Sequence, residues 1–90
     1  MAFSFVRLKK TVEEGGIVVE EGTFNLAGVT TGNITADTSA DPKMVKIREH
    51  FTSSDGDLAI AEALDVAATT LKITGTSGDT GTYTIKGKAA

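Results

Sequence analysis

Aspartates in polar stretches are the residues of this chain that could do chemistry by binding a metal. Carboxylates on loops that converge can hold a hard cation such as calcium. The candidates are Asp37, Asp41, Asp55, Asp57 and Asp79. The run Asp55-Gly56-Asp57 lacks the further acidic positions and the terminal glutamate of a calcium loop. Because aspartate is also a common turn residue, we predict no metal site unless these loops meet in space.

Nucleophilic catalysis has few residues to draw on. His50 is the sole histidine, so a histidine pair cannot form and only one histidine could act as a base. None of the candidate serines lies in a strained elbow; they are Ser4, Ser39, Ser53, Ser54 and Ser77. The late glycines form no phosphate-binding motif, and we interpret them as turn glycines: Gly75, Gly78, Gly81 and Gly87. We therefore predict that the chain is not an enzyme and uses no cofactor.

Composition limits the remaining classes of function. The 90 residues suffice for one small domain, and the absence of cysteine excludes disulfides and thiolate metal sites. The net charge of -3 and the pI near 5.0 argue against a nucleic-acid partner, which needs a basic surface. At the N-terminus the apolar residues precede the basic ones, the reverse of a signal peptide. We expect neither a secretory signal nor a membrane-spanning segment, and no membrane partner.

The elements that must position these residues read as strands. Turn signals recur every eight to twelve residues or so, and β-branched residues dominate between them, which is typical of a small sandwich or barrel. The fold class we predict is mainly β, a small β-sandwich or barrel-like domain with at most one short helix. We expect two parts: an extended N-terminal arm at residues 1–12 and a single β domain at residues 13–90.

Three local predictions follow from the two-residue period of strands. Leu71 to Gly87 reads as a β-hairpin around the turn Ser77-Gly78-Asp79. In the run that ends at Phe51, we expect Val45, Ile47 and Phe51 on one side and Lys46, Arg48 and His50 on the other. Residues 58–68 fit both helical and strand spacing. There we expect a helical turn or irregular segment near 57–62 and a strand at about 63–66.

A family resemblance adds to this interpretation. The chain runs through Thr31-Gly-Asn-Ile-Thr-Ala, a basic-aliphatic strand that ends in Phe51, a Ser/Asp/Gly loop, and the strands Leu71-Lys-Ile-Thr-Gly and Asp79-Thr-Gly-Thr-Tyr-Thr-Ile-Lys-Gly. This order resembles small proteins encoded among the virion genes of tailed bacteriophages, and it covers roughly two-thirds of the chain. The resemblance implies a head decoration or cement protein that binds the shell of major capsid protein, often as a trimer. It transfers no site residue. We expect the chain to be a homo-oligomer, with a trimer favoured, because association would stabilise a domain with so thin a core.

The arm is our candidate for the contact with that partner. We expect Phe3, Phe5, Val6 and Leu8 to be its anchors and Arg7 and Lys9 its polar partners. Deleting residues 1–10 should then abolish particle binding and leave the fold intact. The expected location is the capsid exterior of a virion, after synthesis in the bacterial host cytoplasm. Two alternatives stay open: a tail or baseplate component, and a carbohydrate- or ligand-binding β module with loops around Asp55 and Asp79, which would have few aromatic residues for stacking on sugars.

Overall fold

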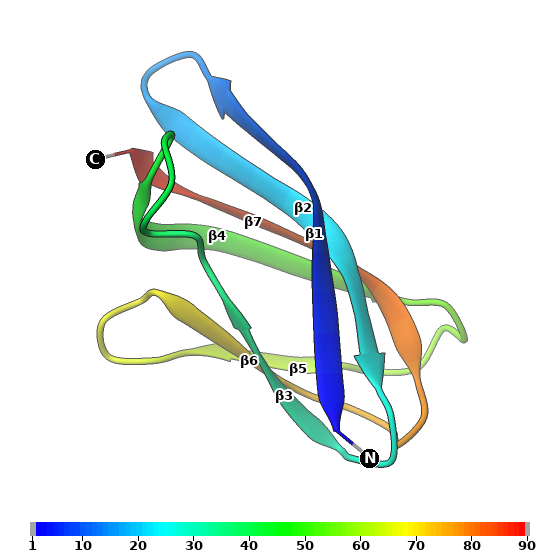
Figure 1. The fold of residues 1–90 in the computed structure, drawn as a ribbon. Helices are drawn as coiled ribbons and strands as arrows, with labels where there is room; N and C mark the ends of the chain where they lie inside the picture. The colour runs from blue at the N-terminus through cyan, green and yellow to red at the C-terminus, as the bar shows by residue number, and fades with distance from the viewer. Residues whose placement is uncertain (1, 90) are drawn as a thin grey trace.

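The computed structural model describes residues 2–89, which form two antiparallel sheets packed face to face (Figure 1). The strands are β1 (Phe3–Glu13), β2 (Ile17–Leu26), β3 (Thr31–Thr35), β4 (Met44–Ser54), β5 (Ala61–Leu64), β6 (Thr70–Thr74) and β7 (Thr80–Ala89). One sheet has four strands in the order β1-β2-β7-β4, and the other has three in the order β3-β6-β5. The prediction of a small, mainly β sandwich is confirmed. Residues 2–89 contain no helix, and therefore none that could span a membrane.

The prediction that Leu71 to Gly87 form a β-hairpin is wrong. β6 pairs with β3 and β5, whereas β7 pairs with β2 and β4 in the other sheet. The loop between them contains a turn, in which the Asp79 N–H donates to the Thr76 carbonyl, but it is also bonded to the other chain segment: the Gly75 N–H donates to the Thr30 carbonyl and the Leu26 N–H to the Asp79 carbonyl. This crossing places the apolar faces of β6 and β7 on opposite sides of one core.

That core lies between the sheets and is made of side chains from both. The buried residues packed together are Val18, Phe24, Leu26, Ile34, Ala36, Met44, Ile47, Leu71, Ile73, Tyr83 and Ile85. Gly81 and Gly87 are buried in β7, so our interpretation of these two as turn glycines is wrong. A Cβ at Gly81 would lie 2.1 Å from the Ser53 carbonyl oxygen, and one at Gly87 would lie 2.1 Å from that of Lys46. At both positions glycine permits the close pairing of β7 with β4.

β4 does not keep the simple alternation that we expected. Its pairing with β7 shifts between Met44 and Lys46 and again between Ile47 and Glu49, and each shift inserts an extra residue. Met44 and Ile47 therefore enter the core, whereas Phe51, expected on the same side as Ile47, is 65% exposed. His50 turns inward instead and contacts Glu62 of β5.

The segment before β5 is irregular. Residues 57–60 belong to no strand or helix, and Asp57 adopts a positive φ of 56°. β5 begins at Ala61 and ends at Leu64, so it starts two residues earlier than predicted and is followed by a tight turn. Pairing with β6 settles the ambiguous stretch as a strand, because it satisfies backbone groups that a lone alanine-rich segment would leave to water.

Contacts between sheets close both sides of the sandwich. On one side β1 lies beside β3, where the Arg7 side chain donates to the Thr35 carbonyl. On the other side β4 lies beside β5, and the Ile47 N–H of β4 donates to the carbonyl of Ala68 in the turn after β5. These two seams hold the edge strands in place.

Candidate functional site

Residues 3–12, expected to form an arm, lie in β1 and pair with β2 (Figure 1). Phe3 packs over Gly32 of β3, where a Cβ would lie 2.1 Å from a ring carbon of Phe3. The Phe5 ring contacts Tyr83 edge to face, with ring centroids 5.9 Å apart. Because both phenylalanines pack against the core, they are not free to anchor a partner.

A bulge at Leu8 divides the remaining predicted contact residues. Arg7 pairs with Gly22 and Lys9 with Glu21, so Leu8 is the extra residue. Before the bulge Val6 points outward with 54% of its surface exposed, and Leu8 itself is 69% exposed. After it the phase changes, so that Lys10 turns inward beside Arg7 and Lys9 points outward. Of the six predicted contact residues, Val6, Leu8 and Lys9 thus face solvent together, and Phe3, Phe5 and Arg7 do not.

The inward charges of β1 form an ion-pair network. The Nε of Arg7 donates to Oε1 of Glu20, whose side chain is 0% exposed, at 2.5 Å. The other oxygen of Glu20 accepts from the Asp37 N–H at 3.0 Å. Lys10 donates to the Asp37 carboxylate at 2.9 Å and to the Ala40 carbonyl. This network, which we call the seam network, joins β1 and β2 to the loop after β3.

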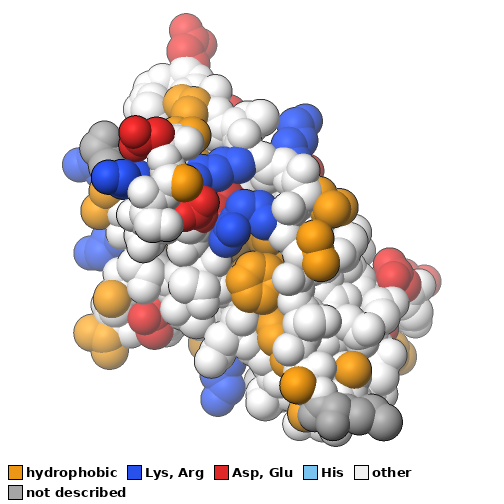
Figure 2. All heavy atoms as spheres, viewed as in Figure 1, with side chains coloured by type: hydrophobic (Ala, Val, Ile, Leu, Met, Phe, Trp, Pro, Cys, Tyr) orange, Lys and Arg blue, Asp and Glu red, His pale blue; other side chains and the backbone are white. Residues whose placement is uncertain are grey.

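Asp37 is the electrostatic centre of that loop. The Lys10 ammonium, together with the N–H groups of Ala40 and Ser39, holds the pKa of Asp37 well below its usual range. Positive and negative side chains lie next to each other in the upper part of the view in Figure 2, with hydrophobic side chains below them. We assign the seam network to fastening β1, because its groups satisfy one another.

The outward side of the four-stranded sheet, which we call the outer face, is different in character. It consists of Ser4, Val6, Leu8, Lys9, Thr11 and Glu13 of β1; Ile17, Val19, Glu21, Thr23 and Asn25 of β2; Thr80, Thr82, Thr84, Lys86 and Lys88 of β7; and Lys46, Glu49, Phe51 and Ser53 of β4. Hydroxyl side chains dominate the end near Ser4, and charges dominate the end near Glu13. Its exposed large apolar residues are Val6 and Leu8 on the edge strand β1 and Phe51 on the opposite edge strand β4.

Shallow hollows cover this outer face. The largest, about 360 Å³, lies between Leu8 and Lys9 on one side and Thr82 and Thr84 on the other. Three more have volumes of about 260, 250 and 130 Å³, and neighbouring hollows share walls at Thr23, Thr84 and Lys86. A wide surface with shared shallow hollows and apolar side chains suits contact with another protein better than enclosure of a small molecule.

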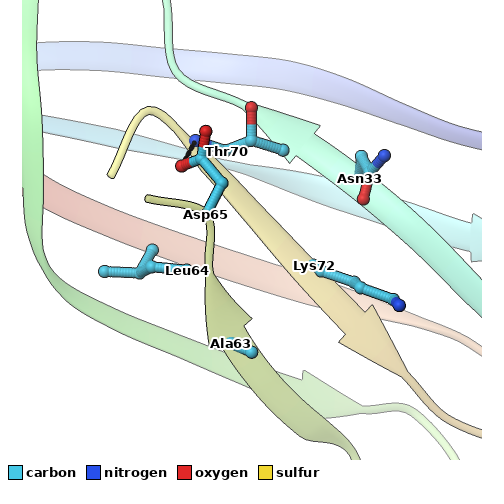
Figure 3. Close-up of a pocket in the computed structure, with 6 residues that line it drawn as sticks. All are labelled: Asn33, Ala63, Leu64, Asp65, Thr70 and Lys72. Atoms are coloured by element: carbon cyan, nitrogen blue, oxygen red, sulfur yellow. Dashed lines mark hydrogen bonds between the residues drawn. The ribbon is translucent and has the colours of Figure 1, made fainter. Parts of the chain in front are cut away.

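The three-stranded sheet carries a separate hollow of about 360 Å³, shown in Figure 3. Asn33 and Lys72 lie on neighbouring strands along it, and Asp65 and Thr70 lie at its far end (Figure 3). The Asp65 carboxylate accepts hydrogen bonds from the N–H groups of Thr70 and Thr69, which lower its pKa. Because Asp65 is committed to this turn, the hollow offers a ligand chiefly Lys72 and the Asn33 amide.

The aspartates that could have bound a metal do not gather into one site. Asp55 accepts from the Thr80 hydroxyl at 2.7 Å, and Asp79 lies beside Gly56, so two of the loops do meet. Asp37 is held by Lys10 elsewhere. Among residues 2–89 no three histidine, aspartate or glutamate side chains are arranged to hold a metal.

Two candidates for nucleophilic catalysis, His50 and Ser54, have structural partners. His50 lies 2.8 Å from Glu62 across the β4–β5 seam. Ser54 accepts from the N–H groups of Gly56 and Leu58, which orders its loop. The Tyr83 hydroxyl is buried with no hydrogen-bond partner among the described residues, and burial raises its pKa to about 12.

Sequence reasoning missed Glu20 and the exposure of Phe51. The signal for Glu20 is present, because the alternation of Val18, Phe24 and Leu26 places Glu20 on the inward face, where a carboxylate needs a partner. No comparable signal exists for Phe51, since the bulges that turn it outward depend on pairing with β7. Comparison of the chain with protein-family models, curated proteins and solved structures found no match.

Proposed function

We propose that this protein is a non-enzymatic virion structural protein of the head-decoration type, which binds the assembled shell of major capsid protein of a tailed bacteriophage. The resemblance of residues 31–87 to such proteins motivates the choice of partner. The observation that carries the proposal is the outer face, where Val6, Leu8 and Phe51 are exposed on one sheet surface between shallow hollows.

The outer face replaces the arm as the docking element. Exposed apolar residues on a polar surface are common anchors of a protein interface, because they lose contact with water when the partner covers them, and here they flank the face on both edge strands. The hydroxyl groups around them can hydrogen-bond to a partner without the desolvation cost of a charge. A shell displays many copies of its subunit, so a weak contact at each site adds up over the particle.

The test compares two sets of substitutions of the same kind. The outer-face variant is Val6→Asn/Leu8→Asn/Phe51→Asn. The control is Leu58→Asn/Val66→Asn, which changes exposed apolar residues away from that face, Val66 being 105% exposed. Both are mixed with shells of the major capsid protein from the same genome and sedimented. We expect the outer-face variant to lose at least about tenfold in affinity, because three apolar contacts are removed together, and the control to bind as the wild type.

Two results would count against the proposal. Equal binding of both variants would exclude the outer face as the docking surface. Labelling of tails instead of heads by the wild-type protein in electron micrographs would replace the decoration role with a tail or baseplate role. Circular dichroism and thermal unfolding of both variants establish that the fold is intact.

A further inference from the structure

Charge on the outer face is divided between its two sides. The β4 and β7 side carries the cations Lys46, Lys86 and Lys88 and one carboxylate, Glu49. The bulge residue Arg48 adds a fourth cation, because it lines the hollow that Glu49 and Lys86 also line. The β1 and β2 side carries Glu13 and Glu21 with one cation, Lys9. Within one copy, Glu13 lies 3.7 Å from Lys86 of β7 in an exposed ion pair, which leaves the other three cations of the β4 and β7 side without a carboxylate partner among residues 2–89. Lys46 and Lys88 are direct cross-strand partners, and the repulsion between their like charges destabilises this pair. None of the ion pairs among residues 2–89 includes Lys46, Arg48 or Lys88.

We propose that a second copy of this chain covers the outer face of the free protein, as a two-fold dimer whose axis runs parallel to the strands. This axis brings the β1 edge of each copy over the β4 edge of the other and keeps the rows of paired residues aligned. Glu13 then lies opposite Lys46, which relieves the repulsion between Lys46 and Lys88. Lys9 lies opposite Phe51 and the bulge residue Leu8 lies beside it, so both exposed apolar residues are covered.

The alternative axis fits poorly. A two-fold axis across the strands would bring the charged end around Glu13 and Lys88 over the hydroxyl end around Ser4 and Thr80, and the cations would be desolvated without counter-charges. With the parallel axis, no row of paired residues places like charges opposite each other.

The size of the contact predicts a reversible dimer. Four strands at ~4.8 Å spacing and ten residues at ~3.4 Å each give a footprint of roughly 600 Å² per copy. A total near 1,200 Å² is at the low end of specific interfaces. This dimer differs from the trimer that the resemblance implies, and the solution mass of the purified chain distinguishes the two.

One consequence rests on the proposed function. If the outer face also docks on the shell, pairing with a second copy and binding to the shell exclude each other, and the free dimer keeps its apolar residues covered until a particle is present. The dimer itself does not depend on the shell, and its test uses the purified chain alone.

Sedimentation velocity of the wild type and of charge-reversed variants tests the inference. The positive variant is Glu13→Lys, the negative variant is Lys46→Glu/Lys88→Glu, and the control is Lys72→Glu on the three-stranded sheet. We expect a dimer for the wild type and the control. Each reversed variant alone should dimerise at least about tenfold more weakly, because two facing contacts become repulsive. An equimolar mixture of the two reversed variants should restore the dimer, since both contacts are again between opposite charges.

Several outcomes would overturn the inference. The first is a wild type that stays monomeric up to about 0.5 mM, which corresponds to negligible affinity. The second is a wild type that forms a trimer. The third is a mixture of the two reversed variants that does not associate. Salt provides a measurement that needs no variant. The wild-type dimer should weaken as ionic strength rises, and a dimer that salt strengthens would contradict the role of charge. None of these results depends on whether the protein binds a particle.

Discussion

Removing the Arg7 guanidinium should destabilise the protein strongly, because it leaves the buried Glu20 carboxylate without its counter-charge. Glu20 is 0% exposed, and its carboxylate is bonded to Arg7 and to the Asp37 N–H. Loss of one partner from a buried ion pair costs about 3–5 kcal/mol. Arg7 is 27% exposed and the Asp37 N–H remains, so we expect about 3 kcal/mol for Arg7→Met, which keeps an apolar stem beside Phe5.

This loss in the free energy of unfolding is large for so small a domain. At about 4–8 °C per kcal/mol for a domain of this size, Arg7→Met should lower Tm by roughly 12–24 °C. Urea unfolding followed by circular dichroism measures the same change as a free energy of unfolding. The double variant Arg7→Met/Glu20→Gln removes the stranded charge and keeps an acceptor for Asp37, so it should lie within about 1 kcal/mol of the wild type.

Lys9→Met is the matched control, because Lys9 lies on the same strand but points outward beyond the bulge. It should change the free energy of unfolding by less than about 0.5 kcal/mol. The reasoning would be refuted if Arg7→Met cost less than about 1 kcal/mol, as expected for an exposed ion pair. It would also be refuted if the double variant were no more stable than Arg7→Met.

Four further predictions concern the same strands. Because the pKa of Asp37 is lowered in the folded state, its stabilising effect is present above the unfolded pKa near ~4 and is lost as pH falls below it; unfolding of Asp37→Asn by acid should therefore depend less steeply on pH than that of the wild type. Burial raises the pKa of Tyr83 to about 12, so its phenol should not ionise near pH ~10 in ultraviolet titration, and the free energy of unfolding should fall between pH ~10 and about 12 because the unfolded chain ionises first. At neutral pH Tyr83→Phe should be neutral or stabilising by up to ~1 kcal/mol, because the hydroxyl has no hydrogen-bond partner among residues 2–89. Gly22→Ala should cost at least ~2 kcal/mol in urea unfolding, since its Cβ would lie 1.9 Å from the Val6 carbonyl oxygen; equal stability would show that β1 can move away at little cost. Deleting residues 1–10 should unfold the domain, because it exposes Tyr83 and leaves the buried Glu20 carboxylate without its counter-charge. Loss of the β-sheet signal in circular dichroism measures this, and a truncated protein that stays folded would support the view of these residues as a separate arm.

Local patterns predicted the class of fold but not the pairing of its strands. Alternation marked Leu71 and Ile73, and Tyr83 and Ile85, as apolar faces, and all four are buried. A hairpin would have placed them on one face of one sheet. The same alternation is equally satisfied when two strands face each other across a core, so the sequence pattern cannot distinguish the two arrangements.

The candidate docking residues show a similar division. Val6, Leu8 and Lys9 were predicted as contact residues and are exposed, but Phe3, Phe5 and Arg7 from the same list pack inward. Strand alternation before the bulge explains why Phe3 and Phe5 point inward and Val6 points outward. The bulge at Leu8 changes the phase for Lys9 and Lys10, and it arises from pairing with β2, which the residues of β1 do not specify alone.

The sequence by itself determined that this chain forms short strands around a thin apolar core without cysteine, because the period of β-branched and polar residues is a local property of the chain. Only the tertiary structure decided which sheet each strand joins, where bulges turn Leu8 and Phe51 to solvent, and that Arg7 neutralises Glu20. Those features depend on partners distant in the sequence, since a strand satisfies its backbone hydrogen bonds and buried charges only through the neighbours that folding brings to it.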